Sequence, residues 1–194
     1  MKERKKMGRG AKVLIAAAAV ILIVLTYAIS IRNDLVKLEQ GVKQSVSDVG
    51  VTLQRRNDLI PNLVSTVRGY ATHEKEVFDA VALAREGMLN AKTMQETVEA
   101  DAELTQSLGR LLAVAEAYPE LKANENFLSL QDELSGTENR IAVARRDFNV
   151  VATEYNTKIR IFPRNMVAKM FKFTEFPLFT AQDDASTVPT VNFE

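Results

Sequence analysis

Hydrophobic residues recur at heptad spacing through a long stretch in the second half of the chain, residues 126–162. The gaps between its apolar and aromatic positions are three, four or seven residues. Only a helix keeps such positions on one side. We therefore predict a helix of about five heptads, long enough to be a wall against which other helices pack. Its seam consists of Phe127, Leu130, Leu134, Ile141, Ala144, Phe148, Val151, Tyr155 and Phe162. Thr137 occupies the seam position between Leu134 and Ile141, where no apolar residue occurs.

An apolar stretch without charges lies near the N-terminus. Residues 13–31 carry no charged side chain and lie between Lys12 and Arg32. As a helix they rise about 28 Å, which matches the ~30 Å hydrocarbon core of a bilayer. A cleavable signal peptide fits less well, because the apolar run is longer than usual and no clear A-x-A site follows. We predict a single transmembrane helix over residues 13–31, in contact with the lipid bilayer.

Basic residues gather on one side of this predicted span. Residues 1–12 carry six Lys or Arg and one Glu, whereas Arg32, Lys37 and Lys43 are the nearest basic residues after it. By the positive-inside rule, the basic tail over residues 1–12 is cytoplasmic. We expect a single-pass protein of the cell (inner) membrane, with its body on the extracytoplasmic side.

The membrane helix is expected to run on into the body. After residue 31 no Pro or Gly occurs before Gly41, and the apolar stripe keeps its period through residue 70. Pro61 cannot donate to the carbonyl of Asn57, so we expect a bent but continuous helix there. The stripe consists of Leu35, Leu38, Val42, Val46, Val49, Leu53, Ile60, Leu63 and Val67.

A second helix is predicted from Thr72, the expected N-cap, with Glu74 and Glu76 in its first turn. Gly87 and the polar residues 90–93 mark its end. Its inward residues are expected to be Val77, Val81, Ala84 and Met88.

A third helix opens where Thr93 and Glu96 have the spacing of a capping box. It closes at Tyr118, because the residue before Pro119 is pushed out of the helical region. Its apolar face consists of Leu104, Leu108, Leu111, Leu112 and Ala115.

The long helix is expected to end at Phe162-Pro163, with a short helical piece over residues 165–171. Residues 180–194 have the composition of a disordered tail. No strand pattern competes along the chain. The predicted fold class is therefore all-α: an N-terminal single transmembrane helix, then an antiparallel four-helix bundle with long helices over residues 32–179.

Two segments resemble proteins of the LemA family. They are QRRNDLIPNLVSTVRGYATHEKEVFDAVALAR over residues 54–85 and EAYPELKANENFLSLQDELSGTENRIAVARRDFNVVATEYNTKIRIFP over residues 116–163. The resemblance continues through NMVAKMFKF at residues 165–173, and the family often has Tyr where Phe148 stands. It implies a bacterial single-pass membrane protein whose soluble part is an antiparallel helical bundle.

This resemblance supplies no catalytic mechanism, because the family has no agreed biochemical activity. Its members include a magnetosome-membrane protein, and some of its genes lie near an HtpX-type membrane protease or TPM-domain proteins. The resemblance thus points to other membrane proteins as partners, with a membrane protease or a TPM-domain protein among the candidates.

Charge and reactive residues exclude several classes of function. The chain has 25 basic residues (Lys and Arg) and 25 acidic residues (Asp and Glu), and six of the basic residues lie in the N-terminal tail. The body is therefore mildly acidic, which argues against a nucleic-acid surface. The chain has no Cys, and Val77 stands where a zinc helix beginning at His73 needs a second His. We expect no metal, cofactor or catalytic site, and no enzyme.

One dense polar cluster has two interpretations. Its arginines could form a recognition patch for an anionic partner, or the cluster could be an ion-pair and amide network that fixes the register of packed helices. We favour the network, and expect Asn139 or Asn149 to be buried and bonded to the first helix near residues 55–62. The cluster comprises Arg55, Arg56, Asn57, Asp58, Asn62, Glu138, Asn139, Arg140, Arg145, Arg146 and Asn149.

The aromatic segment at residues 166–179 also allows two interpretations. It contains four Phe, two Met and two Lys. Such a segment could fold back as a lid over the end of the bundle, or contact lipid headgroups or a partner.

The leading hypothesis is a scaffold or adaptor for membrane proteins, acting in their biogenesis or quality control. The alternative is a lipid- or peptide-binding module that opens between bundle helices. The small residues 16–19 in the span could let two membrane helices approach closely, so a homo-oligomer is a further alternative.

Overall fold

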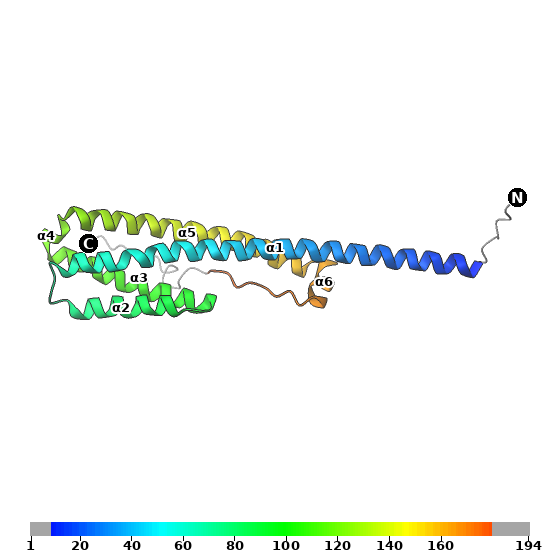
Figure 1. Ribbon diagram of the computed structural model, residues 1–194, viewed down its shortest axis with the longest axis horizontal. Coiled ribbons are helices and arrows are strands. Elements are labelled where there is room, and N and C mark those ends of the chain that lie inside the picture. Colours follow the sequence, from blue (N-terminus) through cyan, green and yellow to red (C-terminus); the bar gives the residue numbers. More distant parts are fainter. Residues whose placement is uncertain (1–8, 180–194) are drawn as a thin grey trace, which may run out of the picture. The chain divides into compact units, whose positions relative to one another are not determined.

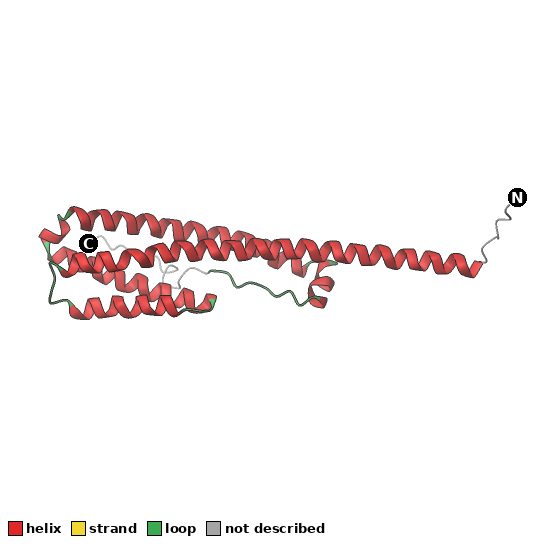
Figure 2. Cartoon of the chain, in the orientation of Figure 1, coloured by secondary structure: helices red, strands yellow, loops and turns green. Residues whose placement is uncertain are grey.

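The computed structural model describes residues 9–179, and every regular element in this range is a helix (Figures 1 and 2). The predicted all-α class is therefore confirmed. Most of the basic tail and all of the predicted disordered tail lie outside the described residues. The helices are α1 (Arg9–Arg68), α2 (Lys75–Asn90), α3 (Met94–Ala117), α4 (Pro119–Lys122), α5 (Glu125–Arg160) and α6 (Arg164–Met170).

The chain divides into two compact units, and both α1 and α5 pass from one into the other. The first unit takes in the chain up to Lys43 together with Val151–Phe176. The second takes in Gln44–Val150 and the chain from Pro177 onward. The predicted boundaries of the span, the bundle domain and the tails stay predictions.

Helix α1 is one continuous helix of 60 residues, as the sequence predicts. Over residues 13–29 its large apolar side chains are 55–72% exposed. The core helix of a soluble protein buries such side chains, so this segment is a candidate membrane span. Further along, the stripe is buried at Leu35 and Val42 in the first unit and at Leu53 and Ile60 in the second. Val46 departs from the prediction, because it is exposed.

Pro61 lies within α1 without breaking it, which confirms the continuity that was predicted there. A proline has no N–H, so the carbonyl of Asn57 lacks its usual partner in the helix. The Arg85 Nε of α2 donates to this carbonyl at 3.4 Å. A side chain from another helix thus replaces the missing backbone donor.

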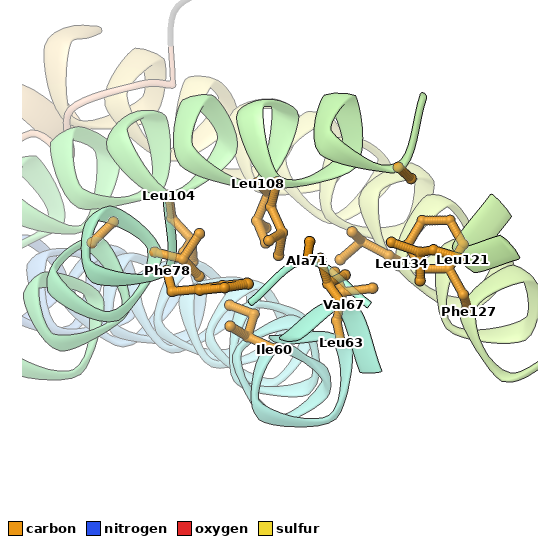
Figure 3. Packing of buried hydrophobic residues seen from close by; sticks show 14 residues of the cluster. Ile60, Leu63, Val67, Ala71, Phe78, Leu104, Leu108, Leu121, Phe127 and Leu134 are labelled. Atoms are coloured by element: carbon orange, nitrogen blue, oxygen red, sulfur yellow. The ribbon is translucent and has the colours of Figure 1, made fainter. Parts of the chain in front are cut away.

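The core of the second unit draws on α1 to α5 (Figure 3). Ile60, Leu63 and Val67 of α1 pack with Phe78 of α2 and Leu104 of α3 in one buried cluster. The remaining members are Ala71, Val81, Ala84, Leu108, Leu111, Ala115, Leu121, Phe127 and Leu134.

The predicted seam of α5 is largely confirmed. Phe127, Leu134, Thr137, Ile141 and Phe148 are buried in the second unit. In the first unit Tyr155 is buried and Val151 half-buried, while Leu130 and Ala144 of the second unit are also half-buried. Phe162 was predicted wrongly, because α5 ends at Arg160 and the Phe162 side chain is 73% exposed.

Two predicted helix starts have different outcomes. Thr72 is not an N-cap: α2 begins at Lys75 after Glu74, which makes no side-chain capping bond. The capping box of α3 is confirmed, since Thr93 Oγ1 accepts from the Glu96 N–H at 3.2 Å and Glu96 accepts from the Thr93 N–H at 3.1 Å. The Lys92 N–H also donates to Glu96, and these backbone donors at Lys92 and Thr93 lower the pKa of Glu96.

Two smaller differences concern the second half of the chain. The short helix α4 was not predicted; Pro119 occupies its first turn, where a missing N–H costs nothing. Helix α6 begins at Arg164 and ends at Met170, one residue earlier at each end than predicted.

Candidate functional site: a buried ion-pair network and two asparagine clamps

All eleven residues of the predicted polar cluster lie in the second unit. These residues differ in how deeply their side chains are buried. Arg56 and Asn57 are buried, and Arg145 and Asn149 are half-buried. The exposed members are Arg55, Asp58, Asn62, Glu138, Asn139, Arg140 and Arg146.

Arg56 of α1 is the centre of an ion-pair network, and its side chain is 0% exposed. Its Nη1 donates to Thr105 Oγ1 of α3 at 3.1 Å and to Glu138 Oε2 of α5 at 2.9 Å. Its Nη2 donates to Asp101 Oδ1 of α3. The second oxygen of Asp101 accepts from Arg145 Nη2 of α5. Two guanidinium groups and two carboxylates thus join three helices.

The balance of charge decides what this network can do. Removing an ion from water costs several kcal/mol, which an opposite charge and further hydrogen bonds must offset. The two positive and two negative groups offset one another here, so the buried part has no surplus positive charge for an anionic ligand. The geometry agrees with the interpretation as a network between helices.

In this network, sequence reasoning missed Asp101 and Thr105. A signal for Asp101 is present, because it precedes Leu104 by three residues and Leu108 by seven, on the apolar face of α3. A carboxylate in such a stripe needs a cationic partner when it is buried.

The amide of Asn57 is 1% exposed, and neither of its polar atoms has a hydrogen-bond partner within the described residues. It lines a hollow of about 200 Å³ with Leu53 and Gln54 of α1, Met88 of α2 and Thr97 of α3.

The other exposed members of the cluster make contacts at the surface of the second unit. Arg55 reaches Glu133 at 3.5 Å, and Asp58 accepts from Gln54 at 2.7 Å. Arg146 pairs with its neighbour Asp147. Asn139 and Arg140 line an open hollow of about 340 Å³ together with Ser45 and Asp48 of α1.

Asn149 does not bond to α1, so the prediction for the amides was wrong. Its Nδ2 donates to the carbonyl of Phe179 at 2.8 Å, and its Oδ1 accepts from the Phe179 N–H at 2.9 Å. The Phe179 ring meets Phe148 edge-to-face at 5.2 Å, and the Arg145 guanidinium lies 5.3 Å from its centroid. We call this set of contacts the Asn149 clamp. Asn139 is exposed, and it forms no comparable pair with any residue in the range 9–179.

The first unit contains a second clamp of the same design. Asn156 Nδ2 donates to the carbonyl of Phe176 at 2.8 Å, and its Oδ1 accepts from the Phe176 N–H at 3.0 Å. The Phe176 ring meets Tyr155 edge-to-face at 5.3 Å. Arg160 pairs with Glu175 through two bonds of 2.6 and 2.7 Å. We call this set the Asn156 clamp.

Two pKa shifts accompany the Asn156 clamp. Burial raises the pKa of Tyr155, with a smaller contribution from Glu39. The hydrogen bond to Glu175, followed by its charge, raises the pKa of Arg160. Neither shift places a titrating group near neutral pH, so both residues serve here as fixed contacts.

Sequence reasoning missed the Asn156 clamp, although its pattern is visible. Phe148-Asn149 and Tyr155-Asn156 are two aromatic–asparagine pairs seven residues apart, and Phe176 and Phe179 are three apart. The clamps show that the segment after α6 folds back onto α5, while Met166, Met170 and Phe171 remain exposed.

No group of three or more residues able to ligate a metal occurs within residues 9–179, and His73 is exposed.

These features define an all-helical protein with a candidate N-terminal membrane span and a polar network between its helices. The model of the LemA family matches residues 45–193, so the chain belongs to the LemA family, as the sequence resemblance indicates.

Several bacterial proteins are similar to the chain. Protein LemA of Metamycoplasma hominis is 26% identical over 153 residues, which cover 78% of this chain and 70% of that protein. Magnetosome protein MamQ 2 of Paramagnetospirillum magneticum is 25% identical, covering 94% and 78% respectively. Magnetosome protein MamQ of Magnetospirillum gryphiswaldense is 26% identical, covering 90% and 75%.

Proposed function

We propose that this protein is a non-enzymatic scaffold or adaptor, anchored in the cell membrane, that holds other membrane proteins through its helical body. Its N-terminus is cytoplasmic, and its four long helices form an antiparallel bundle on the extracytoplasmic side. Its partners are membrane proteins under assembly or surveillance, with a membrane protease or a TPM-domain protein as candidates.

The observation that carries this proposal is the continuity of α1. The candidate span and the buried stripe of the body belong to one 60-residue helix with no loop between them. Because a helix transmits position along its length, such an anchor holds the body close to the bilayer. That placement suits a protein that acts on membrane neighbours.

Two further observations support it. The buried charges of the second unit pair with one another across helices, an arrangement that stabilises packing rather than presenting a group to a substrate. The relatives named magnetosome proteins also favour a role in organising a cellular structure.

Crosslinking in native membranes tests the proposal. The chain has no native Cys, so a single cysteine can carry a photo-crosslinker at an exposed apolar position such as Val51, Val143 or Val150. We expect a small set of membrane proteins to be captured. A matched variant in which an unrelated transmembrane helix replaces residues 13–31 should keep these partners, because the body selects them. Hydrolytic turnover by the purified protein that persists without the anchor contradicts the proposal.

A lipid- or peptide-binding module is the second candidate, and one observation favours it. A hollow of about 400 Å³ lies between α3 and α5, lined by Leu108, Leu112 and Leu134 beside Arg56 and Glu138. Native mass spectrometry of the purified protein would reveal a bound lipid. A Leu112→Trp variant that fills the hollow should lose it if this candidate is right, and should leave crosslinked partners unchanged if the scaffold is right.

A further inference from the structure

Helix α6 directs its larger apolar side chains away from the core of the first unit. It buries Val167 and Ala168. Met166 and Met170, one turn apart on the other side, are 64% and 63% exposed, although a helix that faces water turns its larger apolar residues inward. Exposed apolar residues also flank the helix in the sequence: Ile161, Phe162 and Phe171. Apolar groups gathered in this way mark a contact with a partner or a membrane. We call residues 161–172 the α6 surface.

The exposed face of α6 is held in place from both ends. The helix begins four residues after α5 ends. After the helix, Glu175 pairs with Arg160 through two bonds, and the Asn156 clamp holds Phe176. A rotation of α6 that buried its methionines would break these contacts. The α6 surface is therefore presented outward by the fold of the first unit.

In the first unit, α5 runs toward the candidate span. Val151 of α5 packs against Gly41 of α1, with its Cγ1 3.7 Å from the position that a Cβ at residue 41 would occupy. Further along α5, the charge of Glu39 acts on Tyr155. Residue numbers thus rise along α5 as they fall along α1. Nine residues of helix rise about 13.5 Å, so the end of α5 reaches the level of Arg32.

A direct contact ties the α6 surface to the same level. The Arg32 guanidinium lies 5.2 Å from the centroid of the Phe171 ring. Arg32 is the first charged residue after the uncharged stretch 13–31. The α6 surface therefore lies where the candidate span ends, and this is the level of the lipid headgroups when the span crosses a bilayer.

The charges of the α6 surface distinguish a bilayer from a protein partner. The surface carries Arg164, Lys169 and Lys172 and no acidic residue. Both lysines are exposed, and they bracket two of the exposed apolar residues. Lysine is depleted in interfaces between proteins. At a membrane its apolar stem lies along the hydrocarbon while its ammonium group meets anionic headgroups. The combination therefore favours lipid as the occupant.

We propose that the α6 surface binds the bilayer at the headgroup level of the leaflet from which α1 emerges, with anionic lipids as the preferred partners. One membrane helix fixes the depth of the body but leaves it free to turn about the helix axis. A second contact beside that axis fixes which face of the first unit lies toward the membrane. This inference rests on the membrane anchor in the proposed function, and it does not depend on the scaffold role.

Fluorescence quenching in vesicles tests this contact on the full chain. The chain has no native Cys, so Met166→Cys and Met170→Cys can each carry one nitrobenzoxadiazole fluorophore at an exposed position. The vesicles contain lipids with a spin-label quencher near the top of the acyl chain. The control is Lys43→Cys, because residue 43 lies about 18 Å beyond the span along the continuous α1. We expect quenching at residues 166 and 170 to be about threefold stronger than at residue 43.

The preference for anionic lipid is tested in the same vesicles. Phosphatidylglycerol should raise the quenching at residue 166 about twofold over phosphatidylcholine alone. The double change Lys169→Gln/Lys172→Gln, made in the Met166→Cys protein, should abolish this difference. The matched control Lys43→Gln/Lys75→Gln removes two exposed lysines elsewhere and should keep it. A difference that survives the loss of both α6 lysines overturns the preference for anionic lipid.

A label in the span separates failure of this inference from failure of the anchor. Leu22→Cys should be quenched by lipids with the spin label near the end of the acyl chain. Quenching at residue 22 without quenching at residues 166 and 170 leaves the anchor standing and overturns the α6 contact. Absence of quenching at residue 22 contradicts the anchor and overturns this inference with it.

Coverage by protein gives a distinct result. A benzophenone crosslinker at residue 166 should form adducts with lipid. Links between two copies of the chain, together with weak quenching at residue 166, assign the α6 surface to a second copy and overturn the bilayer as its occupant. Circular dichroism checks that each variant keeps its helices.

Discussion

The Arg56 network and the Asn149 clamp both use polar side chains to fasten α5 to another part of the second unit, yet they differ in burial. Arg56 and Asp101 are almost completely inaccessible to water, and each bears a full charge. Asn149 is half-buried and neutral, and it bonds to backbone at the edge of the unit. Burial, more than the number of bonds, therefore determines how tightly a polar contact constrains the fold. A broken buried ion pair leaves an unpaired charge, whereas a broken clamp leaves groups that water can reach.

The largest effect is expected for Asp101→Ala. This change leaves Arg56 without its buried counter-charge and Arg145 without its carboxylate partner, so we expect a loss of about 3–5 kcal/mol in the free energy of unfolding. Denaturant unfolding of the full chain in detergent, followed by circular dichroism, measures it.

The matched control for this variant is Arg55→Ala, which removes an exposed arginine one residue from Arg56. Exposed ion pairs contribute about 0–1 kcal/mol, so we expect little change. Similar losses for Asp101→Ala and Arg55→Ala would contradict the contrast in burial.

Removing both charges of the buried pair should cost less than removing one. In the double variant Arg56→Met/Asp101→Leu no unpaired charge remains between α1 and α3, although Arg145 and Glu138 must turn to solvent. We expect it to be more stable than either single variant by about 1–3 kcal/mol. A double-mutant cycle measures this coupling, and purely additive losses would show that the two charges do not depend on one another.

A smaller effect is expected at the clamps. Asn149→Ala removes one donor and one acceptor that face the Phe179 backbone, and we expect a loss of about 1–2 kcal/mol. Amide hydrogen exchange should become faster at Phe179, while the amides of α1, α3 and α5 around the Arg56 network stay protected. Asn156→Ala should act in the same way on Phe176, and Asn139→Ala, at an exposed amide, is the control that should change neither.

The smallest effect is expected at Glu96, where a carboxylate accepts backbone N–H bonds in full exposure. The N–H donors of Lys92 and Thr93 lower its pKa below the ordinary value of 4.5. A lowered pKa contributes stability that is present above the unfolded pKa and is lost as the pH falls through the folded value. Fraying of the α3 N-terminus should therefore begin only in acid, below about pH 4.5.

An NMR titration of the Glu96 side chain checks this expectation. Thr93→Ala removes one side of the capping box and keeps the backbone donors of Lys92 and Thr93, so the pKa of Glu96 should remain below 4.5 in that variant. A Glu96 pKa at or above its ordinary value would contradict the capping geometry.

The long helices and most of their buried faces were predictable from the order of the residues alone. Helical periodicity is a local property, so the heptads of α1, α3 and α5 could be traced without knowing their neighbours. The capping box of Thr93 and the continuity through Pro61 were equally local, and both were confirmed. The prediction of Thr72 as an N-cap was wrong, because a potential cap competes with other turn geometries in the chain that precedes the helix.

Which polar residues are buried, and which groups they contact, could not be predicted and depends on how the helices pack. Arg56 occupies the position of the α1 stripe between Leu53 and Ile60, but its partner Asp101 lies 45 residues away in the sequence. Asn149 finds its partner 30 residues on, at Phe179. A polar side chain in a helix has many possible partners at such separations, and the spacing along one helix cannot choose among them. The packing of the helices chooses, because a buried charge or amide is stable only where its counterpart arrives.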